Sequence, residues 1–135
     1  MKQTGIWLDK EKAYIVSIDN ENETFETVLS NIEHFNAHGG SGTKLKGGPQ
    51  DVVQDSKYLE REKQQLKQYF KTIASHINDT NALDIFGPAD TNEKFGKVLH
   101  KNYKSLSTKI KGIEKADSMS VNQVKALVRD FFKSN

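Results

Sequence analysis

A segment rich in glycine and lysine, residues 37–55, contains the residue types best suited to binding chemistry. Five of the ten residues 39–48 are glycine, so the backbone there can adopt positive φ and let another molecule approach closely. Lys44 and Lys46 add positive charge that suits phosphate groups. The segment is not a Walker phosphate loop, because no Gly-Lys-Ser/Thr precedes a helix at the required spacing. Its composition fits either a long flexible binding loop or a solvated surface connection.

The elements around this loop indicate one α/β domain over residues 1–135. Three short runs rich in β-branched and aromatic residues precede the loop and predict strands joined by polar turns. After the loop, apolar residues repeat with helical spacing, and capping-box patterns at Asp90–Glu93 and Ser120–Gln123 predict two helix starts. We expect strands at 4–9, 13–19, 24–35, 82–86 and 108–113, and helices at 56–78, at 90–104 and from Ser120 onward.

The predicted order is therefore β-β-β-α-β-α-β-α. A three-stranded antiparallel meander followed by strands in right-handed parallel crossovers is the ribonuclease-H-like arrangement, a mixed sheet found in several nucleic-acid enzymes and ribosomal proteins. No internal repeat and no second domain are evident in the sequence.

The composition points to a cytoplasmic protein without a resident cofactor. The chain has no cysteine, which excludes disulfides and thiolate metal sites and fits a reducing compartment. Its N-terminus has no apolar run typical of a signal peptide, and no stretch approaches the ~20 apolar residues that cross a bilayer. We therefore expect no membrane partner.

Positive charge is concentrated in the second part of the chain. Residues 1–36 carry three Lys against seven Asp and Glu, a balance of −4, so the remainder of this +2 chain carries +6. On the helix predicted at 56–78, one face is apolar and the opposite face presents basic residues, which we assign to RNA binding: Lys57, Arg61, Lys67 and Lys71. A second stripe, Lys94 to Lys104, could contact an RNA backbone or water equally well.

The loop ends in Lys44-Leu45-Lys46-Gly47-Gly48-Pro49-Gln50 before this basic helix. That sequence resembles the Gly-Gly-Gln loop in the central domain of eukaryotic and archaeal class-1 peptide-chain release factors, a family that includes Pelota and small stand-alone bacterial members. The segments Ile85–Asp90 and Ala116–Gln123 are also similar to the bacterial relatives, and the element order matches over most of the chain.

The resemblance implies a role for each part of the loop. Gly47 and Gly48 would allow close approach to the tRNA end, and Gln50 would be the catalytic residue that places the hydrolytic water while its backbone N–H stabilises developing negative charge. Lys44 and Lys46 would contact ribosomal RNA. The implied partner is the ribosome or tRNA, and the implied process is peptide release or ribosome rescue.

Pro49 departs from the family pattern. It separates the glycines from Gln50, removes one backbone N–H and biases Gly48 toward extended geometry. An extra residue moves the glutamine by up to ~3.5 Å, and a misplacement of 1 Å can cost about 100-fold in rate. The sequence therefore favours ribosome or tRNA binding over release chemistry.

Two alternatives belong to other functional classes. A regulatory or stress protein could keep the fold without peptidyl-tRNA chemistry. A two-metal nuclease would need converging carboxylates, and its candidates are Asp9, Asp84 and either Glu60 or Glu62. The four histidines show no metal-ligand spacing, so no zinc site is expected, and no hydrolase triad is indicated.

Overall fold

The computed structural model of the chain describes the backbone of residues 1–32 and 48–134 and the side chains of 1–32 and 60–133. Its strands are β1 (Lys2–Leu8), β2 (Lys12–Asp19), β3 (Asn22–Leu29), β4 (Ala82–Gly87) and β5 (Ile110–Lys115). Its helices are α1 (Gly48–His76), α2 (Thr91–Asn102), α3 (Lys104–Ser107) and α4 (Val121–Ser134).

The five strands form one mixed sheet in the order β3-β2-β1-β4-β5. β1, β2 and β3 are antiparallel neighbours, whereas β4 pairs parallel with both β1 and β5. Every residue of β4 is buried, which is why its sequence, ALDIFG, is almost continuously apolar rather than alternating. The predicted meander followed by parallel strands is therefore confirmed as a sheet topology.

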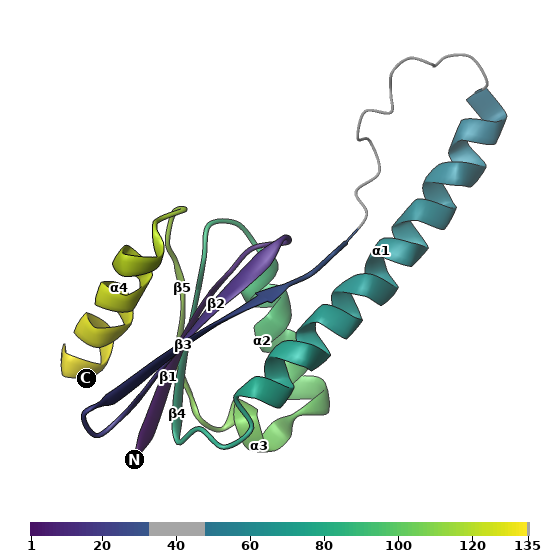
Figure 1. Cartoon of the computed structure of the whole chain (residues 1–135). Helices are drawn as coiled ribbons and strands as arrows, with labels where there is room; N and C mark the ends of the chain where they lie inside the picture. The colour runs from purple at the N-terminus through teal and green to yellow at the C-terminus, as the bar shows by residue number, and fades with distance from the viewer. Residues whose placement is uncertain (33–47, 135) are drawn as a thin grey trace.

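Helices cover both faces of the sheet and give the molecule three layers (Figure 1). One core lies between the sheet and α1, α2 and α3, and it includes Phe70, Ile73 and Phe95. The other core lies under α4 and includes Trp7, Val124 and Val128. Trp7 and Phe86 are 1% and 2% exposed, so both aromatic side chains pack inside the molecule.

The C-terminal half of α1 is anchored to the sheet. No side chain between residues 60 and 68 is buried, and burial begins at Tyr69, whose hydroxyl donates a hydrogen bond to the backbone oxygen of Asp9 at 2.9 Å. Phe70, Ile73 and Ile77 then fill the core at 2%, 0% and 0% exposure. The N-terminal half of α1 projects beyond the sheet (Figure 1).

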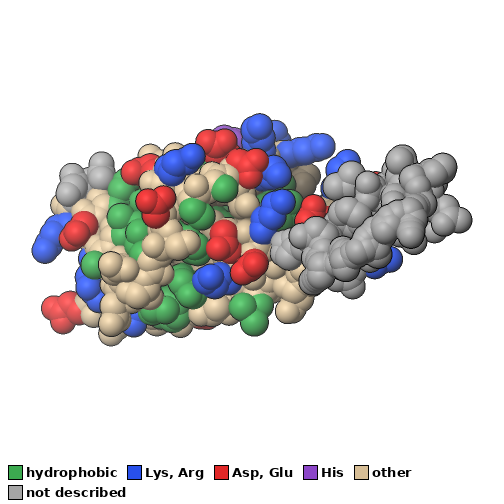
Figure 2. All heavy atoms as spheres, turned by 90° about the horizontal axis from the view of Figure 1, so that it is seen from above, with side chains coloured by type: hydrophobic (Ala, Val, Ile, Leu, Met, Phe, Trp, Pro, Cys, Tyr) green, Lys and Arg blue, Asp and Glu red, His purple; other side chains and the backbone are tan. Residues whose placement is uncertain are grey.

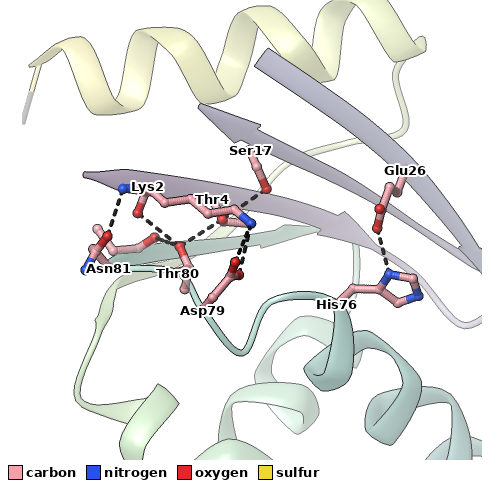
Figure 3. A network of polar contacts seen from close by, with 9 residues as sticks. Lys2, Thr4, Ser17, Glu26, His76, Asp79, Thr80 and Asn81 are labelled. Atoms are coloured by element: carbon pink, nitrogen blue, oxygen red, sulfur yellow. Dashed lines mark hydrogen bonds and ion pairs between the residues drawn. The ribbon is translucent and has the colours of Figure 1, made fainter. Parts of the chain in front are cut away.

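A buried polar cluster fixes the chain where α1 leads into β4 (Figure 3). The Thr80 hydroxyl donates to Thr4 Oγ1 at 2.8 Å, and Thr4 Oγ1 lies 3.2 Å from Ser17 Oγ. The backbone N–H of Lys2 donates to Asn81 Oδ1, and the N–H of Asn81 donates to the Lys2 oxygen, both at 2.8 Å. These bonds join the base of α1 to β1 and β2.

Three predicted element boundaries are wrong. The strand predicted over 24–35 corresponds to β3, which ends at Leu29, and residues 30–32 are not in a strand. α1 begins at Gly48 rather than Ser56, so residues 48–55 of the predicted loop are helical; Pro49 is tolerated because the first-turn N–H groups have no intrahelical partner. The helix predicted to reach Lys104 ends at Asn102, and α3 follows after a break at Tyr103, whose φ and ψ are −134° and 63°. The observed order thus gains a short helix before β5.

The two predicted capping boxes differ in outcome. Ser120 and Gln123 form the reciprocal pair, with Ser120 N donating to Gln123 Oε1 at 2.8 Å and Gln123 N donating to Ser120 Oγ at 3.2 Å. Asp90 makes no side-chain cap, because its φ and ψ of −111° and 2° depart from the extended geometry of a capping residue. Its carboxylate lies 3.7 Å from Lys94 Nζ instead.

The close approach of α4 to β1 generates a stability prediction. A Cβ at Gly5 would lie 2.4 Å from Val128 Cγ2, so Gly5→Ala forces α4 away and should lower the free energy of unfolding by about 1–3 kcal/mol. Urea unfolding followed by Trp7 fluorescence measures the change. Val128→Ala in the Gly5→Ala background should cost less than the two single changes added together, because it removes the clash.

Gly96→Ala is the matched control for that experiment. Its added methyl would meet the end of the Ile113 side chain, which is 37% exposed and can rotate away. Alanine also has the higher helix propensity, so this variant should be as stable as the parent or more stable. A Gly5→Ala protein that matches Gly96→Ala in stability would contradict the packing argument.

Candidate functional site

The predicted catalytic segment lies at the N-terminal end of α1. Lys44, Lys46 and Gly47 fall outside the described residues. Gly48 and Gln50 occupy the first turn of α1, and Lys57 follows on the same helix. Because α1 is anchored at its other end, the Gly48–Gln50 backbone sits at the far end of the projecting half (Figure 1).

The first turn of a helix offers backbone donors. Its initial N–H groups have no intrahelical acceptor, and they form the positive end of the helix dipole. Gln50 contributes one such N–H, whereas Pro49 has none. The turn can therefore bind an anionic group, but its helical backbone differs from the extended geometry that we expected for Gly48.

Three of the four basic residues predicted for α1 have described side chains, and these lie on its solvent-exposed side. Arg61, Lys67 and Lys71 are all exposed. Neither Lys67 nor Lys71 has a carboxylate partner among the side chains that the structure describes. On the face seen from above, basic and acidic side chains are interspersed rather than separated (Figure 2).

The second predicted lysine stripe is divided by the structure. Lys94 pairs with Asp90, whereas Lys97 and Lys101 are exposed on α2. Lys104 belongs to α3, because the chain turns at Tyr103. The turn is fixed by the N–H groups of Leu106 and Ser107, which both donate to the Tyr103 oxygen at 3.0 Å. Lys104 therefore lies on α3 and does not continue the row of lysines formed by Lys97 and Lys101 on α2.

The structure does not bring the nuclease candidates together. Asp9 Oδ1 accepts hydrogen bonds from the N–H groups of Glu11 and Lys12, at 2.8 and 2.9 Å, and so closes the turn between β1 and β2. Asp84 is buried in the middle of β4, and Glu60 is exposed on α1. Across the described ranges, no group of three His, Asp or Glu side chains is placed to hold a metal ion.

Two of the four histidines, His34 and His38, are outside the described residues. His76 pairs with Glu26, with Nδ1 2.7 Å from Oε1, and so links the end of α1 to β3 (Figure 3). His100 is exposed on α2.

Within the part of the chain that is described, none of the helices is long and apolar enough to cross a membrane.

Asp84 is a buried acid, and neither its burial nor its raised pKa was expected from the sequence. Its neighbours Leu83 and Ile85 face α1 and α2, so strand alternation directs Asp84 toward the α4 side. Asp84 is fully buried, and neither of its side-chain oxygens has a hydrogen-bond partner among the described groups. Its position as the single acid in an apolar strand was the available signal.

Burial raises the pKa of Asp84 to about 8, and the adjacent Glu114 carboxylate adds to the shift because two negative charges repel each other. A Cβ at Gly112 would lie 2.6 Å from Asp84 Oδ1 and 2.9 Å from Glu114 Oε2, so this glycine leaves room for both groups. At neutral pH, Asp84 is therefore mostly protonated.

No family model matches the sequence, and no curated protein matches it. Solved structures that share its fold include two archaeal translation factors. Pelota from Archaeoglobus fulgidus is 10% identical, with a TM-score of 0.54 over 98% of this chain and 36% of the Pelota chain. The archaeal translation termination factor aRF1 is 7% identical, with a TM-score of 0.52 over 98% of this chain and 39% of that chain.

The chain is thus an α/β domain with the fold of one part of these two translation factors. The resemblance that the Lys44–Gln50 segment predicted is confirmed at the level of the fold. The chain spans less than two fifths of the length of either structure, as the 36% and 39% coverages show.

The raised pKa of Asp84 generates a pH prediction. An unfolded aspartate has a pKa of about 3.9, so between that value and about 8 the folded state holds a proton that the unfolded state has lost. The free energy of unfolding should therefore decrease as pH rises through this interval, by up to about 1.4 kcal/mol per pH unit from this group. Asp84→Asn, which keeps the shape without the charge, should remove this dependence.

The measurement is urea unfolding of the parent and of Asp84→Asn at pH 5, 6.5 and 8. The variant should gain stability relative to the parent as pH rises. Asp117→Asn, which changes an exposed carboxylate, should track the parent at every pH. A constant difference between Asp84→Asn and the parent from pH 5 to 8 would show that Asp84 does not titrate in this range.

Proposed function

We propose that the chain is a translation-associated domain that binds the ribosome or tRNA through its loop and the basic side of α1. The proposal rests on the fold that the chain shares with Pelota and aRF1 over 98% of its length. Within it, residues 1–135 act as a single ribonuclease-H-like domain in the cytoplasm, and ribosome rescue is the specific process that the resemblance suggests.

The geometry of α1 supports this proposal. From Leu66, the first described residue of α1 that packs against the core, to Gly48 the helix extends about 27 Å, at 1.5 Å per residue. Arg61 lies on this projecting part, and Lys67 and Lys71 lie at its base. A projecting helix with exposed cations can enter a groove of a large RNA and neutralise phosphates along its length. It would carry the Lys44–Gln50 segment to the deepest point of that groove.

The position of Gln50 favours binding over hydrolysis. In the proposed site, Gly47, Gly48 and Gln50 approach the tRNA end while Lys44 and Lys46 contact RNA. Pro49 adds a residue before Gln50, and the first turn of α1 holds Gly48 and Gln50 in helical geometry. Both features are unfavourable for placing water at a peptidyl ester within the ~1 Å tolerance of efficient catalysis. A regulatory domain without peptidyl-tRNA chemistry is thereby favoured as the second candidate.

The first functional prediction concerns ribosome binding. The purified chain should co-sediment with ribosomes at low salt and be released at high salt, because phosphate contacts release counterions. A triple variant, Lys57→Gln, Arg61→Gln and Lys67→Gln, should bind at least tenfold more weakly. The matched control removes the same charge far from α1, through Lys111→Gln, Lys115→Gln and Lys133→Gln, and should bind within about twofold of the parent. Absence of binding by the parent chain at any salt concentration would overturn the proposal.

The second functional prediction concerns Gln50. On ribosomes carrying peptidyl-tRNA, the parent chain should release no more than about one hundredth of the peptide that an active release factor liberates in the same time. Gln50→Ala should leave this background release unchanged. Substantial release that disappears in Gln50→Ala would instead identify Gln50 as catalytic and remove the binding-only interpretation.

A further inference from the structure

A groove lies where the base of α1 meets the turn between α2 and α3. It encloses about 450 Å³. The α1 side contributes Lys71, Ala74, Ser75 and Asn78. The opposite side contributes Asn102, Tyr103, Lys104, Ser105 and Leu106. This place is distant in sequence from the loop and was not indicated by any local motif.

The floor of the groove is apolar. Ala74 and Leu106 are 2% and 5% exposed, and both belong to the core between the sheet and these helices. Tyr103 is half-buried and packs against the same core. An apolar floor of this kind can receive the flat face of a base or a ribose ring.

The rim of the groove is positively charged. Lys71 and Lys104 are exposed, and they extend from opposite walls. Neither forms an ion pair with any carboxylate in the described part of the chain, and no acid is among the lining residues. Two unneutralised cations beside one groove create a local potential that attracts an anion placed between them.

Neutral polar groups complete the lining. The amides of Asn78 and Asn102, one from each wall, make no hydrogen bond with other described residues. Each amide offers two donors and an acceptor, which suits phosphate oxygens and the ribose 2′-hydroxyl. Lys67, one helical turn before Lys71, extends the same side of α1 toward the projecting half.

We propose that this groove binds a phosphodiester segment of an RNA strand, with the phosphate between Lys71 and Lys104 and the adjoining nucleoside against Tyr103 and Leu106. The inference rests on the proposed function, because it supplies a second contact for an RNA that also follows α1. It differs from the loop contact, since the groove lies at the anchored end of the helix. The charge on both walls matches a phosphate, and the apolar floor beside it matches the adjoining base and ribose of a nucleic acid strand.

The test measures binding of a fluorescein-labelled single-stranded RNA of about 12 nucleotides by anisotropy. The double variant Lys71→Gln and Lys104→Gln should lose roughly tenfold in affinity near 0.1 M salt, and the slope of log K against log salt should shrink by about 1.4. Lys115→Gln with Lys133→Gln removes equal charge at the end of β5 and on α4, outside the groove lining, and should stay within about twofold of the parent. Equal losses in the two double variants would overturn the proposal, because they would reflect net charge alone.

A second measurement locates the strand. The chain has no cysteine, so a single introduced cysteine can carry a photo-crosslinker without competing labels. Ser105→Cys in the groove should crosslink to the RNA, whereas Ser118→Cys, exposed between β5 and α4, should not. Crosslinking of equal yield at both sites would overturn the assignment. Displacement of the RNA by adenosine monophosphate at equal concentration would also overturn it, since the groove would then be a mononucleotide site.

The two proposals fail in different ways. If the parent chain binds ribosomes and loses binding in the Lys57, Arg61 and Lys67 triple variant, but the groove variant binds both ribosomes and RNA as the parent does, the groove inference is wrong and the proposed function stands. If the parent chain binds neither ribosomes nor the RNA, both are wrong.

Discussion

The contact between the C-terminal half of α1 and the sheet fixes the positions of both candidate binding surfaces, the projecting half of α1 and the groove at its base. Phe70, Ile73 and Ile77 bury completely or nearly so, and each such side chain contributes about 1.5–3 kcal/mol relative to an exposed one. The Thr80, Thr4 and Ser17 hydroxyls then fix the following turn, so the axis of α1 is set at its base. The direction of the projecting half, and one wall of the α1–α3 groove, both follow from this anchor.

The sheet was largely predictable because its signals are local. β-branched residues, polar turns and the apolar run of β4 identify each strand without knowledge of its neighbours. The beginning of α1 was mistaken because the glycine- and lysine-rich segment was assigned to a loop as far as residue 55, although proline is well tolerated in a first turn. Asp90 and Ser120 carry the same capping pattern, yet the Asp90 backbone adopts φ and ψ of −111° and 2°, and its carboxylate lies near Lys94. The spacing of residues in the sequence does not reveal which φ and ψ the residue before a helix adopts.

The candidate site also has one part that the sequence predicts and one part that it does not. The basic side of α1 follows from helical periodicity, and the exposure of Arg61, Lys67 and Lys71 agrees with it. The α1–α3 groove was unpredictable, because it exists only where α1 meets the turn at Tyr103 and joins residues that are distant in the chain. The environment of Asp84 was predictable only in part. Its isolation in an apolar strand was visible, but its proximity to Glu114 depends on the pairing of β4 with β5.

The absence of buried side chains between residues 60 and 68 has a thermodynamic consequence. That stretch of α1 contacts the core only through the partly buried Leu66, so its helicity depends largely on intrinsic propensity and on neighbours within the helix. A partner that covers it would supply the missing tertiary contact and would stabilise the helix by its own binding free energy. Order in this half of α1 and occupancy by a ligand are therefore coupled quantities, and each should increase with the other.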